Sequence, residues 1–136
     1  MKTLKRVSNF EYLGITFDEK LEWQDQINKV YKKLNQRLFF MRKLNSFNID
    51  KTLLSLFYKS CVLSTVTFCL TAWGGNARVR DRTRIDRALK SAGKMMNCVQ
   101  YDTTNLVLSR LCIAKLGSIL ADPSRPIFSF IHTQIL

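Results

Sequence analysis

Hydrophobic residues recur at steps of three and four along most of the chain, the spacing that places them on one face of a helix. The first such stripe follows Trp23 and continues to Met41. Asn45 to Asn48 then supplies turn-forming side chains, and Asn48 or Asp50 is placed to cap a second helix. The pattern therefore predicts a helical hairpin. The members of the first stripe are Ile27, Val30, Tyr31, Leu34, Leu38 and Met41.

The stretch from Leu53 to Leu70 is almost entirely apolar or small, with Lys59 as its single charge. A membrane span is the alternative to a buried helix here. Lys59 lies in the middle of the stretch, where a charge in lipid costs about 3 kcal/mol on insertion scales, and five Ser or Thr residues dilute the hydrophobicity. We therefore expect a buried central helix that ends at Gly74 and Gly75.

Two further helices are predicted toward the C-terminus. One carries the stripe Ile85, Leu89, Ala92, Met96 and Val99. The other begins at Asp102 or Thr103 and stops before the Asp122-Pro123 pair.

The segment from Val7 to Phe17 has β-branched and aromatic residues around Asn9 and Gly14, which predicts a short hairpin. The predicted fold is mainly α, with a short N-terminal β-hairpin followed by a bundle of about four helices. A chain of 136 residues fits one domain. We divide it into a hairpin at 1–22, a helical region at 23–122 and an irregular tail at 123–136.

Basic residues outnumber acidic ones by 22 to 10, and the net charge of +12 favours an anionic partner, with nucleic acid first. Lys and Arg bind its phosphates without reading the base sequence. One candidate patch comprises Arg78, Arg80, Arg82, Arg84, Arg87, Lys90 and Lys94. A second comprises Lys29, Lys32, Lys33 and Arg37, although a solvated helix face explains any single charge equally well. Tyr12, Tyr58 and Trp73 are candidates for stacking on bases or for ordinary packing.

The sequence offers no catalytic, metal or cofactor site. The chain has no Asp-Asp pair for two-metal chemistry, and Asp102 fits a helix cap better. Asp81 and Asp86 are expected to form surface ion pairs. The four cysteines are far apart, His132 is the single histidine, and we expect reduced, buried thiols. No secretory signal follows the basic N-terminus, so we expect a nuclear or cytoplasmic protein.

A set of spaced motifs resembles the end of the palm and the thumb of reverse transcriptases from non-LTR, LINE-type retrotransposons. It includes Tyr12-Leu13-Gly14-Ile15, then Leu21 and Trp23, Phe68 to Asn76, and Ile119 to Pro126. The resemblance implies that the hairpin, with Tyr12 and Gly14, lies near the primer end. It also implies that the helices grip an RNA-DNA hybrid or RNA by its backbone, while the catalytic carboxylates lie in the palm, upstream of this hairpin. We therefore expect a non-catalytic fragment with an uncovered apolar hairpin surface that favours instability or self-association.

The chain is also similar to a short profile named after the N-terminal region of an AlkB-type repair protein. The iron site of such dioxygenases needs two histidines and a carboxylate, and the chain has one histidine. Two alternatives to nucleic-acid binding stay open: a helical protein-interaction module, and a translated remnant without function. The oligomeric state cannot be predicted from the sequence.

Overall fold

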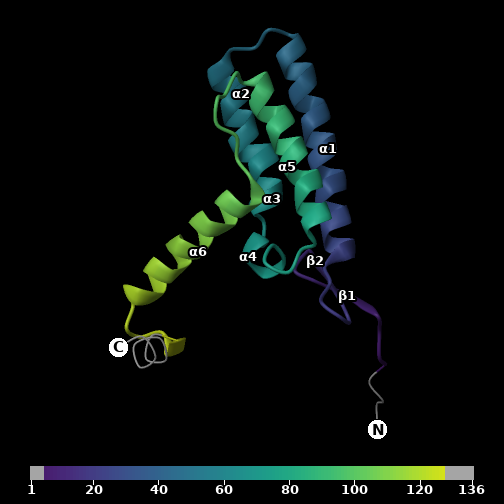
Figure 1. Cartoon of the computed structure of the whole chain (residues 1–136), viewed down its shortest axis with the longest axis vertical. Coiled ribbons are helices and arrows are strands. Elements are labelled where there is room, and N and C mark those ends of the chain that lie inside the picture. Colours follow the sequence, from purple (N-terminus) through teal and green to yellow (C-terminus); the bar gives the residue numbers. More distant parts are fainter. Residues whose placement is uncertain (1–4, 128–136) are drawn as a thin grey trace.

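The computed structural model describes residues 5–127 and is mainly helical, with a two-stranded antiparallel hairpin before the helices (Figure 1). This confirms the predicted fold class. The hairpin pairs β1 (Asn9–Tyr12) with β2 (Ile15–Asp18). The helices are α1 (Gln24–Ser46), α2 (Lys51–Phe57), the π-helical η1 (Tyr58–Leu63), α3 (Ser64–Thr67), α4 (Leu70–Trp73), α5 (Val79–Met95) and α6 (Thr104–Leu120).

The hairpin closes through a two-residue turn at Leu13 and Gly14, both with positive φ. Such turns match the twist of the paired strands and favour glycine at the second position. Ile15 on β2 is buried and joins the core of the helices, whereas every residue of β1 is exposed. Phe10 and Tyr12 stack on each other with ring centroids 6.3 Å apart. The hairpin surface expected to be uncovered is therefore exposed on β1.

Asp18 connects the hairpin to α1. Its carboxylate accepts hydrogen bonds from the backbone N–H groups of Glu22 (2.8 Å), Trp23 (2.6 Å) and Lys20 (3.1 Å). These bonds, led by the one from Glu22, hold the pKa of Asp18 below its ordinary value. The ionised form of Asp18 is therefore the one that fits the fold.

Protonation of Asp18 is expected to destabilise the connection between the hairpin and α1. Because the pKa is lowered in the folded state, the contribution is present above the unfolded value of about 4 and is lost as pH falls through the folded value. We expect Asp18→Asn to lower the unfolding temperature at neutral pH and to reduce its acid dependence. Thermal unfolding of the wild-type and Asp18→Asn proteins, followed by circular dichroism from neutral to acid pH, tests this prediction. Equal acid dependence of the two proteins would contradict the role of Asp18.

Residues 51–73 do not form the single buried helix that the apolar pattern predicted. Asp50 caps its start, as expected, by accepting from Thr52 N. The helix widens to a π-turn at η1 and breaks at Phe68 and Cys69, where Cys69 has a φ of 52°. By length and composition, Lys51–Trp73 is the one stretch among residues 5–127 that qualifies as a membrane span, with 28% of its most apolar window buried.

The π-turn follows from the spacing of the core residues. Leu54, Tyr58, Val62 and Val66 are all buried at intervals of four. A regular helix turns about 100° per residue, so three steps of four drift by about 120° around the axis. A π-turn takes up one additional residue and returns the later side chains to the same face. The core therefore imposes η1 on this segment.

The chain returns from α5 to α6 along the bundle and is held there by Tyr58, whose hydroxyl donates to Asp102 at 2.8 Å (Figure 1). Burial, and then this bond, raise the pKa of Tyr58. Thr103, one of the two predicted start residues, caps α6. Val99 was wrongly placed on the apolar stripe: it lies beyond α5 and is 97% exposed. His132 and the rest of the predicted tail beyond Ile127 lie outside the described residues.

The expected surface ion pairs of Asp81 and Asp86 are found only in part: Asp81 pairs with an arginine but is buried, and Asp86 forms no ion pair among residues 5–127. Asp81 is buried and lies 3.4 Å from the guanidinium of Arg84. Asp86 accepts the backbone N–H of Thr104 at 2.7 Å. Asp81 therefore pairs within α5, whereas Asp86 connects α5 to the start of α6.

Candidate nucleic-acid interface

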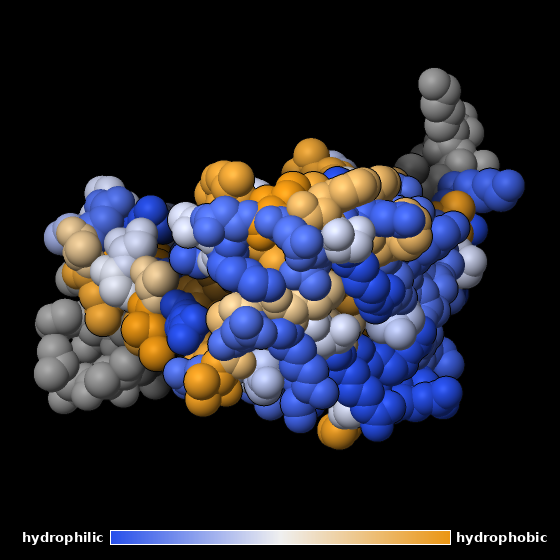
Figure 2. Space-filling model, turned by 90° about the horizontal axis from the view of Figure 1, so that it is seen from above, coloured by the Kyte–Doolittle hydropathy of each residue, from blue (hydrophilic) through white to orange (hydrophobic). Residues whose placement is uncertain are grey.

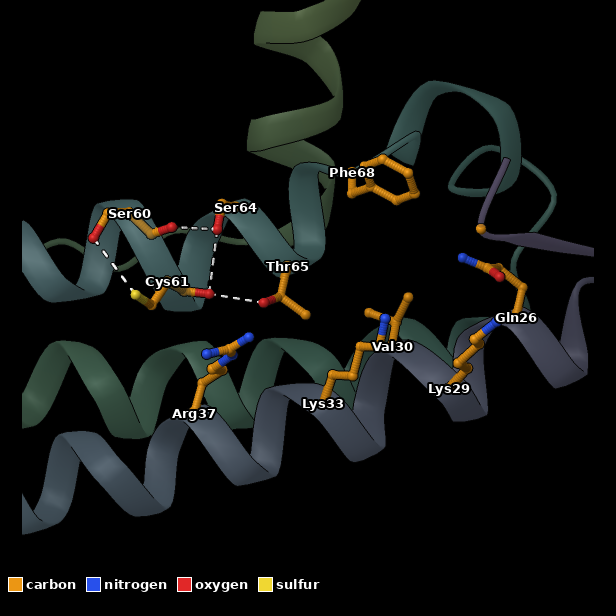
Figure 3. Close-up of a pocket in the computed structure, with 11 residues that line it drawn as sticks. Gln26, Lys29, Val30, Lys33, Arg37, Ser60, Cys61, Ser64, Thr65 and Phe68 are labelled. Carbon is orange, nitrogen blue, oxygen red and sulfur yellow. Dashed lines mark hydrogen bonds between the residues drawn. The ribbon is translucent and has the colours of Figure 1, made fainter. Parts of the chain in front are cut away.

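Three of the predicted cations lie along one face of α1. Lys29, Lys33 and Arg37 follow each other at intervals of four, so each is about 6 Å further along the helix axis than the last. They line one wall of an open groove of about 470 Å³, and Figure 3 shows Lys33 and Arg37 directed toward the helix on the other side. We call this the basic groove. Its lining residues are Gly14, Gln26, Lys29, Val30, Lys33, Arg37, Ser60, Cys61, Ser64, Thr65 and Phe68.

The opposite wall of the basic groove is formed by η1 and α3. The hydroxyls of Ser60, Ser64 and Thr65 donate to backbone carbonyls one turn earlier, at 2.8, 2.5 and 2.7 Å. Figure 3 shows the bonds of Ser64 and Thr65. Their protons are therefore engaged within the helix, and their oxygens present lone pairs to the groove. The cations on α1 are consequently the groups in this groove that suit an anion.

The turn of the hairpin forms one end of the basic groove. Gly14 lies there, and a side chain at this position would come within 3.9 Å of Phe68. Glu11 on β1 accepts from Lys29 Nζ at 2.6 Å. This hydrogen bond and the charge of Lys29 lower the pKa of Glu11. Lys29 is thus partly neutralised, whereas Lys33 and Arg37 have no ion pair among residues 5–127.

The cations predicted on α5 do not share one surface. Arg78 pairs with Glu22 at 2.7 Å, and Arg82 donates to Asn105 at 3.0 Å. Lys90 lies 5.8 Å from the centroid of the Tyr101 ring. One turn of an α-helix takes about 3.6 residues, so cations spaced two or three residues apart are distributed around α5 and do not line one face of it. Arg80 and Lys94 on α5 and Lys32 on α1 are exposed but do not line the basic groove.

A second groove of about 240 Å³ runs between α1 and α5. Arg84 and Arg87 line it from α5, and Arg42 lines it from α1. Arg42 was not among the predicted binding residues, because its local sequence does not distinguish it from other exposed cations of α1. The three arginines become neighbours through the packing of α1 on α5. We call this second groove the arginine groove; Tyr31, Asn35, Leu38, Ala88 and Ser91 complete its lining.

Of the three aromatic residues considered for stacking on bases, Tyr12 is the one that is exposed, at 56%. Tyr58 and Trp73 are buried, and Trp73 donates its Nε1 hydrogen to the carbonyl of Phe68 at 3.2 Å. Both therefore serve packing. The expectation of buried thiols is wrong: Cys61 and Cys69 are half-buried, Cys98 and Cys112 are exposed, and all four are free of disulfide bonds. Within residues 5–127 no three potential metal ligands are grouped together.

Polar and apolar surfaces are separated on the outside of the molecule. In Figure 2, hydrophilic residues cover most of the right-hand side of the view, whereas hydrophobic ones are exposed toward the middle and left. The fold and its grooves thus define a small helical protein with a strongly basic surface.

Comparison with known proteins relates one part of the chain to a family. Residues 23–64 match the family model described as alkylated DNA repair protein alkB homolog 8, N-terminal. The matched segment covers less than a third of the chain and contains α1, α2 and η1; α1 forms one wall of the basic groove, and η1 forms part of the other. No curated protein and no solved structure matches the chain.

Proposed function

We propose that this protein binds nucleic acid by its phosphate backbone, without sequence preference, and that the basic groove is the binding site. The observation that carries the proposal is the row of Lys29, Lys33 and Arg37 along one groove wall. From Gln26 to Ile49 the sequence has six basic residues and no acidic one. When the cations of such a row neutralise phosphates, the counterions condensed on the nucleic acid are released into solution, and the affinity therefore depends strongly on salt.

The sequence resemblance to LINE-type reverse transcriptases supports an RNA-DNA hybrid or RNA as the preferred partner. In that family the corresponding helices hold primer-template nucleic acid. The family matched by residues 23–64 is named for DNA repair, which is also nucleic-acid biology. We propose that the segment acts by binding, as part of a retrotransposon-derived reverse transcriptase sequence, and that polymerisation is not carried by these residues.

The decisive experiment is a salt series with a labelled RNA-DNA hybrid. Three phosphate contacts predict a slope of about −2.7 for log affinity against log salt, so a fourfold rise in salt weakens binding about 40-fold. Replacing Lys33 and Arg37 by Gln is expected to reduce the magnitude of the slope by about 1.8, because two contacts are lost. Fluorescence anisotropy measures both quantities.

The matched control removes the same charge elsewhere. Lys59→Gln with Lys115→Gln takes two positive charges from exposed positions outside the basic groove. We expect this variant to keep most of the wild-type slope. An equal reduction of the salt slope in both variants would mean that net charge governs binding. A folded wild-type protein that does not bind the hybrid would refute the proposal.

A protein-interaction role is the second candidate, favoured by the exposed side of the helix at residues 51–73. Leu53 and Leu56 are 58% and 62% exposed there. Apolar side chains exposed together on a helix are a common feature of docking surfaces. Saturable binding of a protein partner that resists moderate salt would support this role over nucleic-acid binding.

A further inference from the structure

We propose that the arginine groove between α1 and α5 is a separate site for a phosphomonoester dianion. It lies on the side of α1 that faces α5, whereas the basic groove lies on the side that faces η1. This inference therefore does not depend on whether the basic groove binds a nucleic-acid backbone.

Contacts with neighbouring side chains fix the position of one arginine of the groove, and the other two have guanidinium groups that are available to a ligand. Arg84 lies over the ring of Tyr31, with Cζ 4.2 Å from the ring centroid. Its guanidinium also donates to Asn28 at 3.3 Å and to Asp81 at 3.4 Å. Stacking and hydrogen bonds together orient the guanidinium fork. Arg42 and Arg87 form no ion pair or side-chain hydrogen bond among residues 5–127.

The charge of the groove matches a dianion. Arg42, Arg84 and Arg87 contribute three positive charges, and Asp81, which pairs with Arg84, contributes one negative charge, so the sum is 3 − 1 = 2. A phosphomonoester carries about −1.5 to −2 at neutral pH, whereas each backbone diester carries a single charge. Like charges collected in one groove repel each other until a counter-charge is bound. A monoester is therefore the better electrostatic match.

The size and donors of the groove agree with a small ligand. About 240 Å³ lies below the range of about 300–1,000 Å³ typical of pockets for drug-sized molecules. Guanidinium forks bind phosphate oxygens in pairs, and Asn35 and Ser91 line the same space with further polar groups. The ligand has two sources that share this chemistry: the terminal phosphate of a nucleic-acid strand, and a free nucleotide or inorganic phosphate.

Calorimetric titration of the whole chain tests the proposal with inorganic phosphate, adenosine 5′-monophosphate and dimethyl phosphate. We expect the first two to bind and the diester to bind at least tenfold more weakly, since the diester brings one negative charge instead of about two to a groove of net charge +2. Lowering the pH from about 7.5 to about 5 should weaken binding, because the second pKa of the ligand is about 6. Equal affinity for the diester would overturn the proposal.

Variants separate this site from the basic groove. Arg87→Gln, or Arg42→Gln if the first variant fails to fold, should reduce phosphate affinity about tenfold, whereas Lys115→Gln on α6 should not. The Lys33→Gln, Arg37→Gln double variant should retain phosphate binding while it loses hybrid binding. Unchanged phosphate affinity in folded Arg87→Gln and Arg42→Gln proteins would refute the site. A gain in Arg87-dependent affinity when an oligonucleotide carries a 5′-phosphate would identify the strand end as the source, and equal binding of free phosphate would identify the free ligand.

Discussion

Trp73→Ala is expected to lower the free energy of unfolding by about 3–5 kcal/mol, the range for removing a fully buried aromatic side chain. Trp73 is completely buried and is the largest of the fully buried side chains among residues 5–127. Its Nε1 also donates to the carbonyl of Phe68, directly at the break between α3 and α4. Marginal stabilities of about 5–15 kcal/mol make such a loss a large fraction of the total.

Urea denaturation followed by circular dichroism measures this loss. Trp73→Phe keeps most of the buried ring and removes the hydrogen bond, so we expect a smaller effect that includes about 1 kcal/mol for that bond. Phe47→Ala, at a side chain 73% exposed, is the control and should change stability by about 0.5 kcal/mol or less. A Trp73→Ala protein as stable as the control would contradict the packing of α4 against the bundle.

Deletion of Thr83 is expected to abolish the fold, whereas deletion of Ser60 is expected to preserve it. Removing one residue from regular α5 rotates all later residues by about 100°, which moves Ile85 and Leu89 away from the core that buries them completely. Ser60 lies within the π-turn, where one residue is in excess of a regular helix. Its removal should convert η1 to α-helix and leave Val62 and Val66 on the buried face.

Thermal unfolding of the two deletion proteins distinguishes these outcomes. We expect a cooperative transition for the Ser60 deletion and none for the Thr83 deletion. The Ser60 deletion also alters the basic groove, because Ser60 contributes to its wall. Two unfolded proteins would show that the π-turn is not a tolerated insertion, and a folded Thr83 deletion would contradict the packing of α5.

Local features of the fold were predictable because they depend on neighbouring residues. Asp50 and Thr103 cap helices through side chains that reach amides two or three residues later. The turn at Leu13 and Gly14 likewise follows from a glycine between two β-forming segments. The break at Cys69 was not predictable, because no glycine or proline marks it and tertiary packing stabilises its positive φ.

Of the two candidate sites, one could be predicted from local sequence and the other could not. The row of Lys29, Lys33 and Arg37 could be predicted, since a spacing of four places side chains on one helix face. The meeting of Arg42 with Arg84 and Arg87 could not, because more than forty residues separate them and the angle between α1 and α5 decides their distance.

By itself the sequence determined the helical periodicity, the cap positions and a strong excess of positive charge, since these properties belong to single segments. The tertiary structure decided which cations share a groove, which are neutralised by Glu11, Glu22 or Asp81, and which aromatic rings are buried. Those outcomes depend on contacts between distant segments, and burial and electrostatic energy are functions of such contacts rather than of local sequence.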